Sequence, residues 1–265
     1  MNSEEIRTRL KHGQAVIGAW LQLPSQDTAE IIGRSGYDWA AADLEHGAVT
    51  RADLPGIFRA LELGGTVPFA RLICADRERI KEALDSGARG LIFPMIETRR
   101  QLDEAIAQAL YPGGEGHFTG RRGVGFSRAN GYGMNLDKHL APENGLGRNI
   151  VLVAQIEHIK AMDELEAIFS HPRLDAYLIG PYDLSASLGR PGDFNCPEFQ
   201  AVLKHLTETA QACGLARGIH QVEPDPVALK ARIDEGYSFL AYGVDALFLA
   251  RAAVNPLPPF SAQTL

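Results

Sequence analysis

The feature that most constrains the fold of this 265-residue chain is a regular alternation of short apolar runs with amphipathic stretches. Apolar runs of this length are typical of strands that are buried on both faces of a sheet. Eight such runs begin at Ala15, Trp39, Val67, Gly90, Ile150, Ala176, Ala216 and Phe239. Because strands that alternate with helices form parallel sheets, we expect an α/β fold of the (β/α)8 TIM barrel type, as one domain over residues 1–265.

The stretches between the runs read as helices, most clearly over residues 76–88 and 98–111. The first of these places Ile80, Ala83 and Leu84 on one face and closes with Gly87, as a helix C-terminus should. The competing architecture is a doubly wound open sheet. It is disfavoured because no Gly-rich phosphate-binding turn follows the first apolar run.

Two segments depart from the alternation. A long connection after the fourth strand, between Tyr111 and Ile150, is rich in Gly, Pro and Asn. Connections of this length are often functional, and this one carries aromatic and basic side chains, so we expect an ordered loop over the active-site end. Those side chains are Phe118, Arg121, Arg122, Phe126, Arg128 and Tyr132. The Pro-rich tail, from about residue 251 to 265, is expected to end the fold or reach a neighbouring subunit.

Charge and cysteine content restrict the partners and the cellular compartment that we expect for this protein. A net charge of −7 leaves no basic stripe to neutralise phosphates, which argues against nucleic acid as a partner. Cys74, Cys196 and Cys213 show no paired spacing, so a disulfide framework is not expected. We find neither a signal-peptide pattern nor an apolar run long enough for a membrane span. We therefore expect a cytoplasmic enzyme without membrane association.

Two carboxylates, Glu157 and Asp183, each stand at the end of an apolar run, residues 150–157 and 176–183. Carboxyl ends of parallel barrel strands meet at one rim, where the active sites of such barrels lie. Carboxylate oxygens are ligands of hard divalent cations. The second and third strands deliver His46 and Arg71 to the same rim. Taken singly, His46 or Arg71 could equally have a structural role. Four strand ends that carry His, Arg, Glu and Asp in one barrel favour an active site.

In these motifs the chain resembles the HpcH/HpaI family, the metal-dependent class II pyruvate aldolases that include the 4-hydroxy-2-oxoheptanedioate aldolases. The resemblance extends from Gly18 to Asp245. The motifs are Asp43-Leu-Glu-His46-Gly, Arg71 after a short strand, Ile92-Phe-Pro-Met95, Arg122-Gly-Val-Gly125, Gln155-Ile-Glu157 and Ile179-Gly-Pro-Tyr-Asp183-Leu-Ser185. The family implies a barrel of the phosphoenolpyruvate/pyruvate type, usually a hexamer (a trimer of dimers) with a C-terminal helix exchanged between paired subunits.

The resemblance also implies site roles. Glu157 and Asp183 correspond to the metal ligands, with Mg²⁺, Mn²⁺ or Co²⁺ as candidates, and Gln155 to a group that holds a water on the metal. Arg71 resembles the arginine that binds the substrate carbonyl oxygen. His46 resembles the acid/base group, and Asp85 the acid that fixes its tautomer. The backbone amides of Tyr182 and Asp183 are expected to bind the pyruvate carboxylate.

The implied reaction is the reversible cleavage of a 4-hydroxy-2-oxo acid to pyruvate and an aldehyde through a metal-bound enolate. A Schiff-base mechanism is improbable because every lysine lies in a helical or loop context. Alternatives on the same site are a citrate-synthase-like condensation of oxaloacetate with an acyl-CoA, an oxo-acid decarboxylation, or an inactive scaffold. Arg121, Arg122 and Arg128 leave the acyl-CoA reading open.

The remaining histidines lack a partner pattern and are interpreted as surface or packing residues. They are His117, His139, His158, His171, His205 and His220. Asp225 and Asp245 are likewise interpreted as structural.

Overall fold

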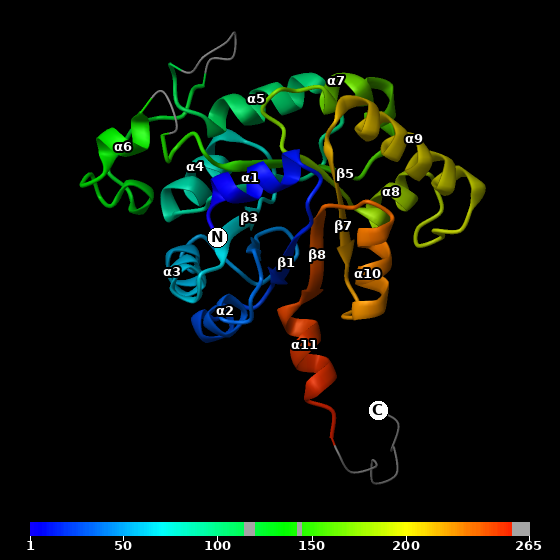
Figure 1. Ribbon diagram of the computed structural model, residues 1–265, viewed down its shortest axis with the longest axis horizontal. Coiled ribbons are helices and arrows are strands. Elements are labelled where there is room, and N and C mark those ends of the chain that lie inside the picture. Colours follow the sequence, from blue (N-terminus) through cyan, green and yellow to red (C-terminus); the bar gives the residue numbers. More distant parts are fainter. Residues whose placement is uncertain (114–119, 142–144, 256–265) are drawn as a thin grey trace.

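The eight strands close into a parallel barrel in chain order, with β8 paired back to β1 (Figure 1). The computed structural model describes residues 1–113, 120–141 and 145–255. The strands are β1 (Val16–Leu21), β2 (Trp39–Asp43), β3 (Val67–Arg71), β4 (Gly90–Phe93), β5 (Val151–Ile156), β6 (Ala176–Ile179), β7 (Ala216–Gln221) and β8 (Phe239–Val244). Each begins within one residue of its predicted start. The predicted (β/α)8 barrel is confirmed.

Helices alternate with the strands along the chain. They are α1 (Ser3–Lys11), α2 (Gln26–Gly33), α3 (Leu54–Gly64), α4 (Arg77–Ser86), α5 (Arg99–Ala109), α6 (Leu136–Leu140), α7 (Leu165–Phe169), α8 (Pro181–Ser187), α9 (Pro197–Cys213), α10 (Pro226–Asp234) and α11 (Asp245–Ala252), with 3₁₀ turns at Arg128–Asn130 and Ile159–Glu164. The two helices predicted most clearly are α4 and α5. The Asp76 side chain caps α4 at its start, and Gly87 ends it at φ 110°, in the left-handed region that favours glycine.

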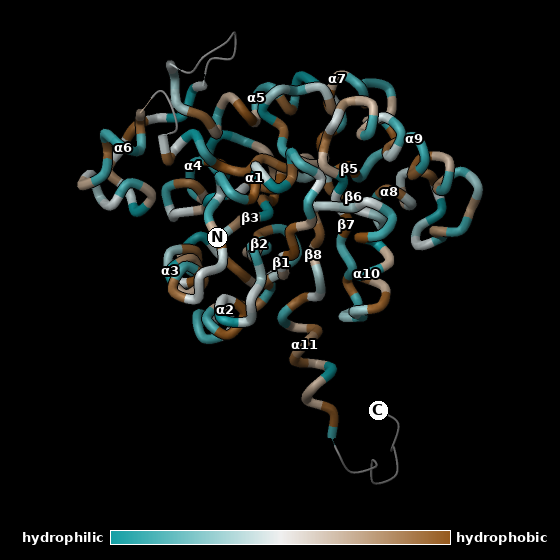
Figure 2. The backbone as a smooth tube through the Cα atoms, in the orientation of Figure 1, coloured by the Kyte–Doolittle hydropathy of each residue, from teal (hydrophilic) through white to brown (hydrophobic). Residues whose placement is uncertain are grey.

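Aromatic rings fill the barrel interior. Trp39 stacks on Phe239 with ring centroids 4.5 Å apart and on Phe69 at 5.1 Å. These rings are fully buried, and the apolar side chains of α1 also belong to this inner cluster. A second apolar cluster lies between the strands and the helices. The hydrophobic segments in Figure 2 follow the strands, as expected for a barrel that is covered on both faces.

The described part of the long connection packs against the outer helices. Arg121 pairs with Glu104 of α5 and Arg122 with Asp85 of α4. Arg128 pairs with Glu62 of α3. No described residue of this connection lines the cavity at the carboxyl ends of the strands. The expectation that the loop covers the active-site end is therefore not met by residues 120–141, and Phe118 lies outside the described residues.

The last helix, α11, leaves the end of β8 and extends away from the barrel (Figure 1). Of the predicted tail, residues 256–265 lie outside the described part of the chain. Among the described helices, none has the length and apolar character to cross a membrane.

The packing of the interior rings leads to a stability prediction. A Cβ atom on Gly18 of β1 would lie 2.1 Å from the Trp39 ring, which is wedged between other aromatic rings. Gly18→Ala should therefore lower the free energy of unfolding by about 2 kcal/mol or more, measured by urea denaturation. Gly123→Ala is the matched control, because a Cβ there meets nothing within 4 Å. Equal stability of the two variants would contradict the tight packing around Trp39.

Candidate active site

A cavity of about 570 Å³ opens at the carboxyl ends of the strands. Its polar and aromatic lining comes from six different strand ends and the loops that follow them. These residues are Trp20, Gln22, His46, Arg71, Gln155, Tyr182, Asp183 and His220. The structure thus brings together His46, Arg71, Gln155, Tyr182 and Asp183, which were all predicted to lie in the site. In a (β/α)8 barrel this is the face that carries the active site.

Arg71, the last residue of β3, is fixed by a buried ion pair with Asp43, the last residue of β2. Arg71 Nε donates to Asp43 Oδ1 at 2.8 Å, and Nη2 donates to Oδ2 at 2.6 Å. Its Nη1 lies 3.0 Å from Glu45 Oε2, and its guanidinium lies over the Trp20 ring, 5.3 Å from the centroid. A bidentate pair of this kind holds the planar cation in one orientation.

Asp43 organises the turn that carries His46. Its Oδ1 accepts the backbone N–H groups of Glu45 and His46, both at 3.1 Å, and Gln22 Nε2 donates to its Oδ2 at 3.0 Å. Burial raises the pKa of Asp43. The hydrogen bonds and charge of Arg71, with the bonds from Gln22 and His46, outweigh that effect, so its pKa lies below the usual value. Asp43 is therefore ionised at neutral pH, and the His46 side chain is left exposed at the rim.

Glu157 follows β5 directly and is almost completely buried, at 2% exposure. One of its oxygens, Oε1, accepts the N–H of Met95 at 3.3 Å, and Met95 itself takes a positive φ of 50°. A Cβ at Gly180 would lie 2.9 Å from Glu157 Oε2, so a larger residue at 180 would crowd the carboxylate. Burial, with the nearby charges of Glu45 and Asp183, raises the pKa of Glu157 to about 7.

Asp183 is not at a strand end, and the predicted strand over residues 176–183 is too long. The strand β6 stops at Ile179, Gly180 is the N-cap, and Pro181 begins α8. Proline suits the first turn of a helix because it has no N–H to leave unpaired. Asp183 therefore stands exposed in that first turn. The N–H groups of the first turn have no intrahelical partner, which leaves the amides of Tyr182 and Asp183 available at the cavity.

The residues around Glu157 fit a divalent cation. Glu157 and Asp183 are close enough for the charge of one to raise the pKa of the other, and a cation between them would relieve that repulsion. Gln155 Oε1 is buried without a hydrogen-bond partner. No group of three or more His, Cys, Asp or Glu side chains that could hold a metal occurs among the described residues. Such a site would offer two carboxylates and leave positions open for water and substrate.

Asp85 does not join His46 within one protomer. Its carboxylate pairs with Lys81 of the same helix at 3.0 Å and with Arg122 at 3.3 Å. It lines a second cavity, next to Ser127 and Arg128, whereas His46 lines the cavity with Arg71. The predicted pairing of His46 with Asp85 therefore stays a prediction, and the described residues of a single chain do not bring it about.

Several residues in or next to the cavity had no assigned catalytic role in the sequence. Asp43 and Glu45 stood within a recognised motif, but only their contacts with Arg71 reveal what they do. His220 was interpreted as a packing residue, yet it lines the cavity. Its position at the end of an apolar run, the same signal that selected Arg71, could have found it. Asp245 is structural as expected, since it accepts the N–H groups of Gln22 and Leu23.

Residues 16–252 match the HpcH/HpaI aldolase/citrate lyase family. The chain belongs to this family. The resemblance seen in its motifs is thus confirmed over nearly the whole sequence.

Two relatives have assigned activities. The chain is 34% identical over 255 residues to a hydroxypyruvate/pyruvate aldolase of Paraburkholderia phytofirmans, covering 95% of each chain. It is also 34% identical to a 2-keto-3-deoxy-L-rhamnonate aldolase of Klebsiella pneumoniae, covering 99% of this chain and 95% of the relative. Among solved structures, an HpcH/HpaI family protein from Burkholderia cenocepacia superposes with a TM-score of 0.85 at 30% identity, covering 94% of this chain and 96% of that one.

The buried pair between Asp43 and Arg71 gives a prediction with a pH dependence. Asp43→Asn removes the bidentate counter-charge of the guanidinium, leaving the single contact with Glu45, and should lower the free energy of unfolding at pH 7 by about 3 kcal/mol. Because the pKa of Asp43 is depressed in the folded state, its stabilisation is present above the unfolded-state pKa and is lost as pH falls through the folded-state pKa. The difference from wild type in urea denaturation should therefore shrink below about pH 4.

The control for this variant is Glu208→Gln, which removes an exposed pair with Lys204. It should change the free energy of unfolding by less than about 1 kcal/mol at any pH. A pH-independent loss in Asp43→Asn would show that the carboxylate charge contributes nothing to the fold.

Proposed function

We propose that this chain is a divalent-metal-dependent aldolase that reversibly cleaves a 4-hydroxy-2-oxo acid to pyruvate and an aldehyde. The observation that carries the proposal is a cavity lined by a fixed cation, Arg71, and by Asp183, with the buried carboxylate of Glu157 near enough to interact with Asp183. The family and the two aldolase relatives support the carbon–carbon lyase activity and the pyruvate product.

Glu157 and Asp183 would hold the cation, for which Mg²⁺, Mn²⁺ and Co²⁺ are the candidates. When bound, a divalent cation would polarise the C2 carbonyl of the oxo acid and acidify its C3 protons. Gln155, whose buried Oε1 lacks a partner in the described structure, would accept a hydrogen bond from a water at this site. These oxygen donors suit a hard cation.

The protein groups around this site would bind the substrate, stabilise developing charge and transfer protons. Arg71 would bind the C2 oxygen and stabilise the negative charge that develops there as a C3 proton is lost. The free first-turn amides of Tyr182 and Asp183 would bind the carboxylate of the oxo acid. His46, exposed at the rim, would carry the proton between the reacting atoms and solvent.

The condensation of oxaloacetate with an acyl-CoA has less support. This alternative requires arginines in the long loop whose side chains are free to bind the CoA phosphates. Arg121, Arg122 and Arg128 each pair with a carboxylate of an outer helix instead. We further propose a cytoplasmic location without nucleic-acid partners, based on the acidic net charge of −7 and the absence of paired cysteines.

The metal proposal has a direct test. The Glu157 carboxylate must lose its proton to bind a cation, and its pKa is about 7, so affinity for Mn²⁺ should fall about tenfold per pH unit below pH 7. Isothermal titration of Mn²⁺ from pH 5.5 to 8 measures this. In Glu157→Gln, binding should be weak at every pH and aldol cleavage lost, with the fold intact by circular dichroism. Full cleavage activity in EDTA-treated wild type would overturn the proposal.

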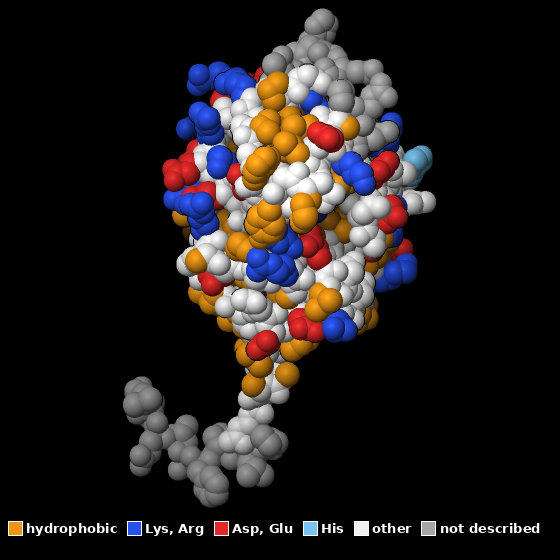
Figure 3. All heavy atoms as spheres, turned by 90° about the vertical axis from the view of Figure 1, so that its left-hand side faces the viewer, with side chains coloured by type: hydrophobic (Ala, Val, Ile, Leu, Met, Phe, Trp, Pro, Cys, Tyr) orange, Lys and Arg blue, Asp and Glu red, His pale blue; other side chains and the backbone are white. Residues whose placement is uncertain are grey.

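We also propose that the protein is a homo-oligomer, as expected of a hexamer with exchanged C-terminal helices. The helix α11 stands away from the barrel with Leu249 60% exposed. A second apolar surface gathers on the face that carries α6 and the loop before it (Figure 3). It includes Phe126 and Met134, which are 77% and 83% exposed. Exposed apolar surfaces of this kind are typical of protein–protein contacts.

This second surface adjoins the cavity that contains Asp85, which suggests how His46 and Asp85 meet. Tyr132, from the same loop, lines that cavity with Asp85. Because a single protomer keeps the two side chains in different cavities, we infer that Asp85 approaches His46 from a neighbouring subunit.

Subunit mixing tests this arrangement. His46→Ala and Asp85→Ala should each form oligomers with less than about 10% of wild-type cleavage activity, because general acid–base groups contribute on the order of 10²-fold or more. Oligomers assembled from both variants should recover activity, since some sites then combine an intact His46 with an intact Asp85. Light scattering confirms assembly. Absence of recovery in verified mixed oligomers would place both residues in the same chain's site or outside catalysis.

A further inference from the structure

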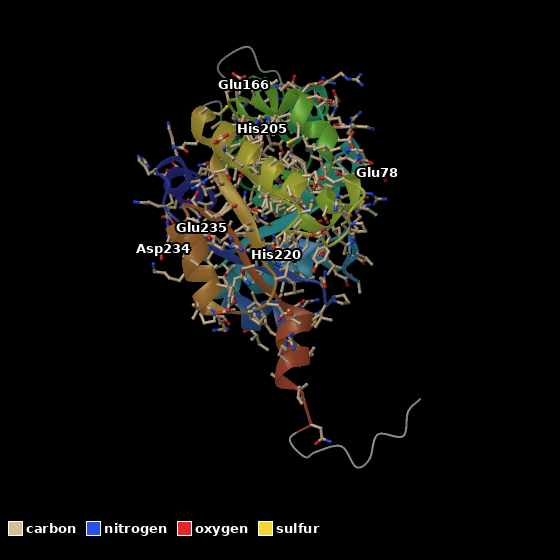
Figure 4. All side chains as sticks on the ribbon, turned by 90° about the vertical axis from the view of Figure 1, so that its right-hand side faces the viewer. Glu78, Glu166, His205, His220, Asp234 and Glu235 are labelled. Atoms are coloured by element: carbon tan, nitrogen blue, oxygen red, sulfur yellow. The ribbon has the colours of Figure 1, made fainter. Side chains whose placement is uncertain are left out.

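His220 lies near the end of β7 (Figure 4). It lines the same cavity as Arg71. Its ring stacks on Trp20 with centroids 4.8 Å apart and planes 24° apart. The Arg71 guanidinium lies over the same indole, 5.3 Å from its centroid. His220 and Arg71 are therefore both held against one aromatic ring, so a substrate at Arg71 lies within reach of the imidazole.

The hydrogen bonding of His220 fixes its tautomer. Its Nε2 lies 3.1 Å from the backbone oxygen of Gly243 in β8. A carbonyl oxygen can only accept, so the ring proton resides on Nε2 and Nδ1 is left as an acceptor. In the described part of the chain no hydrogen bond engages Nδ1. Because the His220 side chain is half-buried and lines the cavity, a ligand there can supply the partner that Nδ1 lacks.

The imidazole also remains uncharged at neutral pH. Burial lowers the pKa of His220 to about 4, and the positive charge of Arg71 acts in the same direction. A neutral ring cannot attract a carboxylate by charge, and an unprotonated nitrogen cannot donate to a carbonyl oxygen. The complement of a neutral acceptor is a hydrogen-bond donor, and among the groups of oxo acids and aldehydes that donor is a hydroxyl.

We propose that His220 selects hydroxylated substrates by accepting, at Nδ1, a hydrogen bond from a hydroxyl on the carbon next to the reacting carbonyl. The inference rests on the proposed aldolase function and names the substrate class of that site. The hydroxyl belongs either to the oxo acid, as in hydroxypyruvate, or to the aldehyde, as in glycolaldehyde. Substrates without it leave a partly buried acceptor unpaired, which disfavours them.

Two variants separate the acceptor from the structural contact. His220→Gln keeps an N–H donor that can reach the Gly243 oxygen, but it loses the acceptor at Nδ1. His220→Asn keeps an acceptor near the position of Nδ1 and loses the donor to Gly243. The contrast between the two distinguishes substrate recognition from support of the barrel wall.

Aldol synthesis is measured with three pairs: pyruvate with acetaldehyde, hydroxypyruvate with acetaldehyde, and pyruvate with glycolaldehyde. In His220→Gln, kcat/KM for one hydroxylated pair should fall about tenfold, the loss expected for a hydrogen bond in a shielded site, with the unhydroxylated pair changed less than about twofold. His220→Asn should retain most of the preference. The pair that loses activity identifies which substrate supplies the hydroxyl.

Equilibrium binding provides a readout that does not require turnover. The chain has two tryptophans, and Trp20 touches His220, so quenching of fluorescence reports ligand binding at the ring. The Kd ratio of pyruvate to hydroxypyruvate, or of acetaldehyde to glycolaldehyde, should fall in His220→Gln alone. An equal fall for all pairs, or unchanged ratios, overturns the inference. If wild type catalyses none of the reactions, the proposed function fails, and the binding ratios still decide the role of His220.

Discussion

Closure of the parallel barrel is the constraint from which the active site follows. Each strand must pair on both edges, and β8 satisfies this by pairing with β1. Closure places all eight carboxyl ends in one ring, so residues far apart in sequence, such as Gln22, Arg71 and His220, share one cavity. The stacked rings of Trp39 and its neighbours fill the interior, which confines the open space to the rim. The reactive groups meet there because the barrel leaves no other common surface.

The charged groups of the site lie close enough to act on one another. Asp43 holds the Arg71 guanidinium in a fixed plane, and Glu45 contacts the same guanidinium. Burial raises the pKa of Glu157, and the nearby charges of Glu45 and Asp183 raise it further. If Glu157 and Asp183 hold a divalent cation, as proposed, that cation would add a second positive charge to the one on Arg71. The two charges together would favour development of negative charge on a substrate oxygen.

The aromatic ring of Trp20 links recognition to this charge arrangement. Arg71 and His220 both rest on it, so the orientation of the cation and of the neutral acceptor depends on the same side chain. Trp20 in turn is positioned by β1, whose end is tied to α11 through Asp245. A movement of α11, the helix proposed to cross between subunits, would therefore change the position of Trp20 and of the side chains that rest on it.

The sequence alone determined the strands, because apolar runs bounded by turns indicate buried β-structure regardless of their partners. It also indicated Glu157 and Arg71, which directly end such runs. It misplaced Asp183, since Tyr177 to Tyr182 stays mostly apolar while Pro181 already starts a helix. Only the tertiary structure showed that Asp43 orients Arg71, that His220 faces the cavity, and that Asp85 lies in another one. Such roles depend on distances between strands, which a one-dimensional pattern does not contain.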